Sequence, residues 1–428
     1  MILLTDNPAR SRLDDRFGFL PYVEALHTAV AAADPLPLTV GVFGSWGTGK
    51  SSFLGMWRDL FQQQGTRTVW FNPWKYDRKV EVWAALLHTI LSEMEQEERL
   101  RDRVTKLARA ATWLSLRAGL GHVATLATGG IVTGADVNNL LDTLTTTDAE
   151  EYRKINAFEA GFAEAVEDFV GPDGRLVVFV DDLDRCSPEA AVTVLESLKL
   201  FLGESHCVFV LALDVDVLSA VATNKFGKAL TGAPDDAVSG SAYLEKIVQL
   251  PFFLPDIGFE TMQMAFRPSL SELGDNLAFW ELVKIGLGTN PRRVKRYLNV
   301  LNLSLATSRA LTGRAPTETE QLQLAELLII QSRHRAFYHL LTREPGGWST
   351  LEQYVTNLRR QPQANRDAAR AMLPMSLAHF AADDALVALL DTSPGSYNDH
   401  PPAPAGDEVR RMISTLHSAV GPETGPPA

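Results

Sequence analysis

The residues with the clearest chemical potential form a glycine-rich run near the start of the chain. Its sequence matches the pattern G-x-x-x-x-G-K-[ST] and reads Gly44-Ser45-Trp46-Gly47-Thr48-Gly49-Lys50-Ser51. The glycines let the backbone wrap phosphate groups, and the amide N–H groups that open a following helix point at them. Lys50 would place its charge on the β- and γ-phosphates, and the Ser51 hydroxyl would be a ligand for Mg²⁺. The run, with Ser52 after it, predicts a nucleoside triphosphate site; the alternative is an accidental glycine-rich turn.

A second group of polar residues follows the apolar run VVFV. The segment DDLDRC places Asp181 and Asp182 directly after this run, where ligands of open parallel sheets bind. Asp181 would hold Mg²⁺ together with Ser51, and Asp182 would orient or deprotonate the attacking water. Because the cation offsets their repulsion, two adjacent carboxylates are tolerable there. An aspartate-rich turn without function is the alternative.

Two further polar residues are candidates for the same site. Asp214 follows the run CVFVLAL and would face the γ-phosphate, although it could equally be the N-cap of a helix. Asn290-Pro291 predicts the start of a helix that carries Arg292 in its first turn. One of the arginines of this helix, Arg292, Arg293 or Arg296, could reach the nucleotide, or all three could belong to a solvated basic face.

The elements that must position these residues alternate between strands and helices. Short, nearly continuous apolar runs predict strands buried on both faces: Leu38–Phe43, Thr68–Asn72, Leu176–Val180, Cys207–Leu213 and Lys246–Leu254. Because the last run contains Pro251, it is expected to be an edge strand or to end early. Helices are expected at Tyr22–Ala33, from Lys50 to Gln63 and after Ser187. This alternation indicates an α/β fold with a parallel sheet covered by helices on both sides.

The spacing of the elements divides the chain further. Residues 1–37 are expected to be a lead-in, 38–258 a nucleotide-binding core, 259–395 helical, and 396–428 a largely disordered proline-rich tail. A helical insertion is expected at about 84–170, opening with a charged helix, Leu91–Ala110, and closing with Phe158, Phe162 and Phe169 at helical spacing. Its uncharged run Ala118–Ala135 is rich in glycine and favours a loop over a membrane span.

Composition bounds the class of protein. The chain has 428 residues, 46% of them apolar, and a net charge of −12, which argues against general nucleic-acid binding. Its two cysteines, Cys186 and Cys207, have no metal-ligand spacing and are expected to be reduced in a cytoplasmic protein. The N-terminal residues lack the pattern of a secretory signal.

Taken together, the motifs resemble the KAP family of P-loop NTPases from about Asp14 to Asn299. The matching segments are DDRFGFLPYVEAL, GVFGSWGTGKSSFL, WFNPWKYD, FVDDLDRC, FVLALDVDVLSAV, YLEKIVQLPFFLP and NPRRVKRYLN. The resemblance implies an ASCE-type sheet, with an extra strand between the phosphate-loop strand and the Asp181 strand, and a helical lid. It also implies that Arg292 senses the γ-phosphate, and that Phe17, Gly18 and Pro21 lie by the adenine. Many members carry membrane helices in the insertion, which here is only weakly hydrophobic.

Three functions remain open at this stage. The first is Mg²⁺-dependent ATP hydrolysis that drives a conformational or assembly switch in bacterial signalling or antiphage defence, through a homo-oligomer or a partner protein. The second is a kinase that uses the same site. The third is a membrane-associated scaffold with slow or no hydrolysis. An arginine or lysine would complete the ATPase on lid closure or from a neighbouring subunit, with Arg292, Lys246 and Arg185 as candidates.

Overall fold

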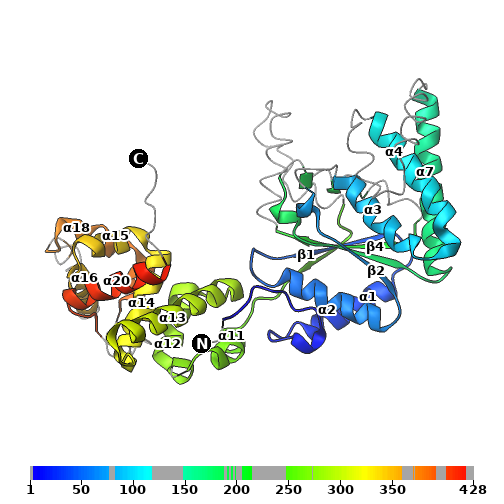
Figure 1. The fold of residues 1–428 in the computed structure, drawn as a ribbon. Helices are drawn as coiled ribbons and strands as arrows, with labels where there is room; N and C mark the ends of the chain where they lie inside the picture. The colour runs from blue at the N-terminus through cyan, green and yellow to red at the C-terminus, as the bar shows by residue number, and fades with distance from the viewer. Residues whose placement is uncertain are drawn as a thin grey trace. The chain divides into compact units, whose positions relative to one another are not determined.

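The computed structural model describes residues 3–76, 82–117, 148–187, 205–214, 247–271, 273–358, 372–391 and 402–420, together with residues 190, 191, 194, 195, 198 and 370. The chain forms two compact units (Figure 1). The core unit is Pro8–Pro255, and the helical unit combines Met1–Asn7 with Asp256–Ala428. The first seven residues are thus grouped with a part of the chain that follows them by about 250 positions.

The core unit is built on a five-stranded parallel sheet. Its strands are β1 (Leu38–Phe43), β2 (Arg67–Phe71), β3 (Leu176–Val180), β4 (Cys207–Leu213) and β5 (Leu250–Phe253). Their order is β2-β3-β4-β1-β5, and every pairing is parallel. The expected strand between the phosphate-loop strand and the Asp181 strand is therefore confirmed as β4. Pro251 lies in the edge strand β5, where an absent N–H costs the least pairing.

Helices cover both faces of this sheet because its central strands are apolar on both sides. β3 and β4 are buried at every residue. One face packs on α1 (Leu20–Ala31) and α2 (Lys50–Gln63) (Figure 1). On that face, Trp57 and Phe61 of α2 meet the ring of Phe179 edge-on.

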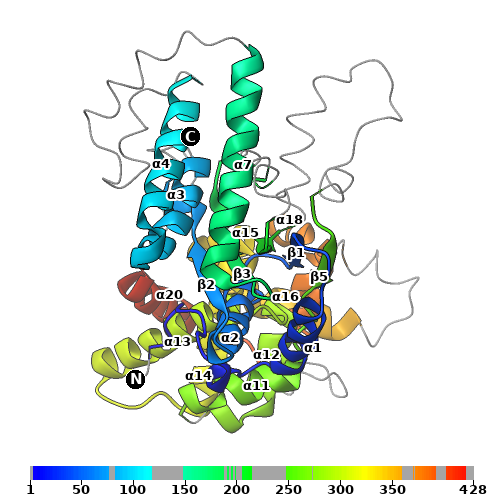
Figure 2. The same cartoon turned by 90° about the vertical axis from the view of Figure 1, so that its right-hand side faces the viewer.

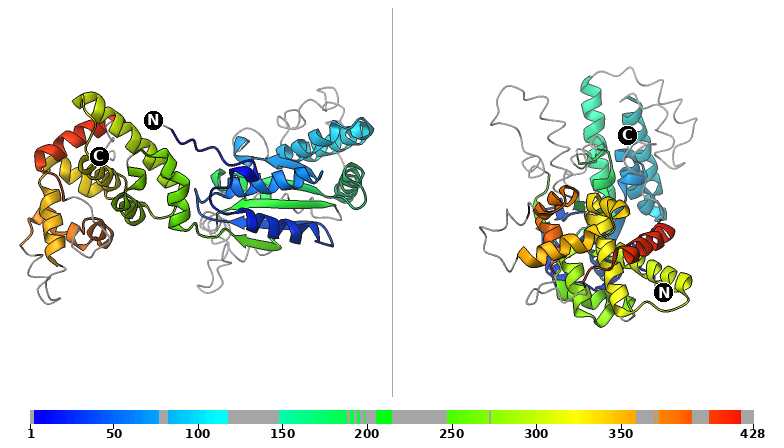
Figure 3. Two further views of the ribbon diagram at one scale, coloured as in Figure 1. Left: turned by 90° about the horizontal axis from the view of Figure 1, so that it is seen from below. Right: turned by 90° about the vertical axis from the view of Figure 1, so that its left-hand side faces the viewer.

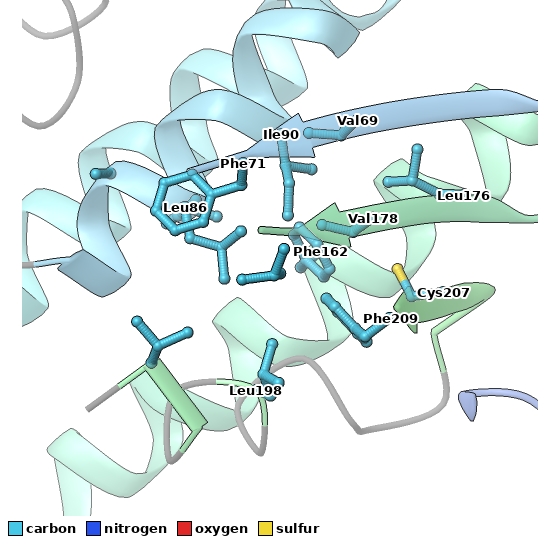
Figure 4. Packing of buried hydrophobic residues seen from close by; sticks show 14 of the residues in the cluster. Val69, Phe71, Leu86, Ile90, Phe162, Leu176, Val178, Leu198, Cys207 and Phe209 are labelled. Carbon is cyan, nitrogen blue, oxygen red and sulfur yellow. The ribbon is translucent and has the colours of Figure 1, made fainter. Parts of the chain in front are cut away.

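On the opposite face the sheet packs on helices that include α3 (Val82–Glu95), α4 (Arg101–Arg117) and α7 (Asp148–Val170). Helices α4 and α7 run side by side (Figure 2). The sheet contributes Phe71, Val178 and Phe209 to the core, and the helices contribute Ile90 and Phe162 (Figure 4). Both cysteines are buried free thiols, and burial raises the pKa of Cys207 to about 12.

The opening of the insertion differs from the predicted charged helix Leu91–Ala110. The structure has two helices there, α3 and α4, with the short 3₁₀ turn Glu98–Leu100 between them. The apolar positions that face the sheet, such as Leu86 and Ile90, begin before residue 91 and set where α3 starts. The glycine-rich run Ala118–Ala135 lies outside the described residues. Among the helices that are described, none is long and apolar enough to cross a bilayer.

The helical unit contains a bundle of packed helices: α11 (Phe259–Phe266), α12 (Leu277–Leu287), α13 (Pro291–Thr312), α14 (Glu318–Arg333), α15 (Arg335–Arg343), α16 (Gly347–Leu358), α18 (Met375–Ala378), α19 (Asp384–Leu389) and α20 (Gly406–Val420). Helix α20 packs along α13 (Figure 3). It lies within residues 396–428, for which disorder was expected, and that expectation was wrong for this segment. Val409, Ile413 and Leu416 are buried at helical spacing and hold it in the bundle.

Candidate functional site

The glycine-rich run forms a tight loop between β1 and α2. It leaves β1 after Phe43, and the Gly44 N–H donates to the carbonyl of Leu213 on the neighbouring strand β4 (3.1 Å). Gly47 and Gly49 have positive φ angles of 89° and 112°, which side chains disfavour. A Cβ on Gly49 would also lie 2.9 Å from the ring of Phe19. The loop therefore requires glycine where the sequence provides it.

Lys50 is the first residue of α2, and its side chain is only 7% exposed. Its Nζ donates to the carbonyl oxygens of Gly44 (2.8 Å) and Ser45 (3.2 Å), which folds the side chain back over the loop. The same Nζ lies 3.1 Å from a carboxylate oxygen of Asp184. The lysine charge is thus held inside the loop, where a phosphate would meet it.

Ser51 and Asp181 meet at the carboxyl edge of the sheet. The Ser51 hydroxyl donates to Asp181 Oδ1 at 2.9 Å across 130 positions of sequence. Burial, and after it the charge of the neighbouring Asp182, raise the pKa of Asp181 from 3.8 to about 6. A divalent cation beside these oxygens would offset both costs. The hydroxyl and carboxylate oxygens present are ligands that Mg²⁺ prefers, so this pair fits the ion.

Asp182 is fixed by its backbone and by two donors. Its φ of 58° makes it the only non-glycine residue with positive φ in the described part of the chain. Asn72 donates its side-chain amide to Asp182 Oδ2 (2.7 Å), and Arg185 Nε donates to Oδ1 (2.8 Å). The guanidinium of Arg185 also lies over the ring of Trp74, 5.3 Å from its centre. These two hydrogen bonds therefore fix the orientation of the Asp182 carboxylate.

Sequence reasoning missed Asn72 as part of this site. Asn72 follows β2, and β2 pairs with β3, whose last residue precedes Asp181. The segment WFNPW drew attention as a family motif, but its contact with Asp182 depends on which strands are neighbours. A polar residue directly after an apolar strand was the available signal.

The N-terminal lead-in reaches the phosphate loop through Phe19. The ring of Phe19 lies beside Gly49 and 5.9 Å from the ring of Phe53 in α2. Phe17 and Gly18 precede it, and Asp15 accepts hydrogen bonds from the N–H groups of both. Phe17 and Gly18, two of the three residues expected near the adenine, are thus held in a turn next to the loop.

Three other predicted site residues have distinct surroundings. Ser52 accepts a hydrogen bond from the N–H of Ala9 at 3.1 Å, so its hydroxyl is engaged with the lead-in. Trp46 is half-exposed at the loop. Asp214 is buried directly after β4, whose Leu213 pairs with Phe43 at the start of the loop.

The structure does not group Arg292 with the phosphate loop. Arg292 belongs to the helical unit, in the first turn of α13, and its Nε lies 3.8 Å from Asp6 Oδ2. The predicted cap of this helix is confirmed, because Asn290 Oδ1 accepts the N–H of Arg293 at 3.1 Å. Lys246 lies outside the described residues.

Comparisons with known proteins agree with the motifs. The KAP family P-loop domain matches residues 19–307. The phage T7 exclusion protein of Escherichia coli strain K12 is 26% identical over 274 residues, covering 56% of this chain and 33% of that protein. The NTPase KAP family P-loop domain-containing protein 1 of Mus musculus is 33% identical over 108 residues, covering 25% of this chain and 17% of that protein. The chain therefore spans a third or less of the length of these relatives.

Among solved structures, the Aeropyrum pernix ORC2 protein in its ADPNP–ADP complexes is similar with a TM-score of 0.38 and 13% identity. That match covers 97% of both chains.

Proposed function

The chain belongs to the KAP family of P-loop NTPases, and from this premise we propose that it binds ATP with Mg²⁺ and hydrolyses it to drive a conformational or assembly switch. The observation that carries the proposal is the meeting of Lys50, Ser51, Asp181 and Asp182 at one edge of the sheet. Transfer of a phosphoryl group to water requires a group that binds the phosphates, side chains that hold Mg²⁺, and an oriented carboxylate. Lys50, the pair Ser51 and Asp181, and Asp182 would fill these roles.

Phosphate binding would use the loop between β1 and α2. The N–H groups at the start of α2 and the Lys50 ammonium would bind the β- and γ-phosphates. Lys50 would exchange its pairing with Asp184 for phosphate oxygens, which carry more charge. Phe17 and Gly18, held by Asp15, would contact the adenine.

Ser51 and Asp181 would hold Mg²⁺, directly or through water. Bound there, the ion would supply positive charge to offset the negative charge on the β- and γ-phosphate oxygens. The chain's own contribution is to keep these two side chains 2.9 Å apart in a buried setting.

Asp182 would position the attacking water and accept its proton. The water oxygen would form a bond to the γ-phosphorus while the bond to the bridging oxygen breaks and ADP leaves. Asn72 and Arg185 would keep the carboxylate aimed during this step. Asp214 would face the γ-phosphate, and Arg292 would supply a positive charge on closure of the lid or of an assembly.

The biological output would be a switch in signalling or antiphage defence, through a homo-oligomer or a partner protein. The support is similarity to the phage T7 exclusion protein, which extends over 56% of this chain.

Replacing Lys50 tests the nucleotide site. Lys50→Ala is expected to abolish ATP binding, measured by isothermal calorimetry with Mg²⁺, because the charge that meets the phosphates is lost. The matched control is Lys106→Ala, which removes an exposed lysine from α4 and is expected to leave ATP affinity unchanged. Unchanged ATP affinity in Lys50→Ala would overturn the assignment of the loop.

Product analysis distinguishes hydrolysis from a kinase reaction. With γ-labelled ATP, the label is expected to appear entirely as free phosphate. Label on a protein or small-molecule acceptor would identify phosphotransfer instead.

A further inference from the structure

The first described residues of the chain lie along one face of α13. The Leu4 N–H donates to Asn299 Oδ1 (2.7 Å), and Asn299 Nδ2 donates back to the Leu4 carbonyl (2.8 Å). Lys295 Nζ donates to the Thr5 carbonyl at 2.9 Å. One asparagine thus satisfies both backbone polar groups of Leu4, as a neighbouring strand would. Residues 4–6 are therefore docked at a defined register.

Asp6 adds ion pairs with α13 to these hydrogen bonds. Its Oδ2 lies 3.3 Å from Arg296 Nε and 3.8 Å from Arg292 Nε. Arg292, Lys295, Arg296 and Asn299 follow one another at helical spacing, so a single stripe of α13 makes all these contacts. The side chains of Arg292 and Asp6 are 22% and 39% exposed, so water and other anions still reach the pair.

The next residues of the chain are fixed to α2 in the core unit. The Ala9 N–H donates to Ser52 Oγ (3.1 Å), and the Arg12 N–H donates to Asp59 Oδ2 (3.2 Å). The approach at Ala9 is close, because a Cβ on Gly55 would lie 2.4 Å from the Ala9 carbonyl oxygen. Ser52 directly follows Ser51.

We propose that Asp6 is a positioning residue that competes with the terminal phosphate of ATP for Arg292. This inference rests on the proposed function, in which Arg292 meets the γ-phosphate. A carboxylate and a phosphoryl group bind a guanidinium through the same kind of hydrogen bond. Asp6 therefore holds Arg292 back until a γ-phosphate takes its place, and Arg296 keeps Asp6 bound to α13 meanwhile.

The competition predicts that the charge of Asp6 weakens ATP binding but not ADP binding. In Asp6→Asn the side chain keeps its shape, and the backbone contacts of Leu4 and Thr5 remain. Its affinity for ATP, measured by calorimetry on the full chain with Mg²⁺, is expected to rise about threefold, the scale of an exposed ion pair. Affinity for ADP is expected to stay at the wild-type value, because ADP has no γ-phosphate. Asp6→Glu keeps the charge and is expected to behave like wild type.

A double-mutant cycle with Arg292→Ala checks that Asp6 acts through Arg292. In that background Asp6→Asn is expected to change neither affinity. Asp407→Asn is the matched control, because it removes an exposed carboxylate that pairs with Arg410 elsewhere in the helical unit.

Four outcomes would overturn the proposal. Equal changes for ATP and ADP, or an effect of Asp6→Asn that survives in Arg292→Ala, would show that Asp6 acts by another route. Unchanged ATP affinity in Asp6→Asn, with a wild type that binds ATP, would remove this inference alone. A wild type that binds neither nucleotide would remove the proposed function and this inference together.

Discussion

Asp182 has an unusual backbone conformation, and both oxygens of its carboxylate accept hydrogen bonds. A positive φ at a residue other than glycine costs free energy, and such strain persists where surrounding contacts impose it. Here the contacts are the donors from Asn72 and Arg185, one to each carboxylate oxygen. Arg185 is itself placed over the Trp74 ring. These contacts therefore hold the strained backbone in place and fix the orientation of the Asp182 carboxylate at the end of β3.

Replacing Asp182 should separate binding from hydrolysis. Asp182→Asn is expected to keep ATP binding, because Ser51 and Asp181 would hold the metal, and asparagine tolerates the left-handed backbone. Turnover of ATP, measured by phosphate release, is expected to fall by more than a hundredfold because the amide cannot accept the water's proton. Turnover within about tenfold of wild type, about 1.4 kcal/mol of barrier, would exclude Asp182 as the water-activating residue.

Asn72 provides a second, graded version of the same experiment. Asn72→Ala removes the 2.7 Å hydrogen bond while Asp182 keeps its charge and its contact with Arg185. Turnover is expected to drop about tenfold with ATP affinity unchanged, because misaligned catalytic groups lose rate rather than binding. If Asn72→Ala matches wild type in turnover, the hydrogen bond has no role in aiming Asp182.

At the scale of elements, α14 is a helix enclosed on all sides over most of its length. Its residues Gln321 to Gln331 are all buried, and Glu326 among them is 1% exposed. Burial, and then the charge of Glu352 on α16, hold the pKa of Glu326 well above its usual value, while a bond from Trp348 opposes them. The helix therefore carries a carboxyl group that the folded state keeps protonated.

Glu326 should make the stability of the helical unit fall as pH rises. Below about pH 4.5 the carboxyl is protonated in both states and contributes nothing. Above that pH the unfolded state releases the proton while the folded state retains it, so the free energy of unfolding decreases, by up to about 1.4 kcal/mol per pH unit. Glu326→Gln is expected to melt several degrees above wild type at pH 8 and to lose that advantage at pH 4.5, by circular dichroism. An equal difference at both pH values would contradict this account.

The strands were predictable because their signal is local. Three of them, Leu38–Phe43, Leu176–Val180 and Cys207–Leu213, have the predicted bounds, since each is a continuous apolar run that ends at a glycine or an aspartate. Helix α20 was missed although Val409, Ile413 and Leu416 lie at helical spacing. Proline-rich flanks suggested disorder, and only the bundle that buries these side chains decides otherwise.

The polar contacts were less predictable because they join distant parts of the chain. Asn72 meets Asp182 across 110 positions, and Asp6 meets Arg296 across 290. The motifs predicted that Ser51 of the loop and Asp181 share one site, and the structure brings the two side chains within 2.9 Å. Which polar residue would hold Asp182, and where the basic stripe of α13 would find its partner, depends on strand order and helix packing.

At the scale of the whole molecule, the chain is acidic, with a net charge of −12. The proposed hydrolysis, in contrast, needs an additional positive charge at the γ-phosphate. Arg292 is engaged with Asp6 in the helical unit, and Arg185 with Asp182 in the core unit. An arginine that enters such a site from outside can raise the rate by roughly 10³–10⁵. Self-association is therefore a route to an active site with more positive charge.

Assembly predicts that specific activity depends on protein concentration. ATP turnover per chain is expected to rise across the range in which light scattering shows association, because a neighbour completes the site. Asp182→Asn, run in parallel, should stay inactive at every concentration. Flat specific activity across that range in the wild type would rule out completion by a neighbouring subunit.

The two buried thiols make this protein convenient to label. At neutral pH the Cys207 thiol carries almost no reactive thiolate, because its pKa is about 12, and Cys186 is also buried. Alkylating reagents act on exposed thiolates, so the native chain should take up dye slowly. A cysteine at exposed position Leu3, just before the residues docked on α13, would then be the fast-reacting thiol. A fluorophore there could report release of the N-terminus in real time without prior removal of either native cysteine.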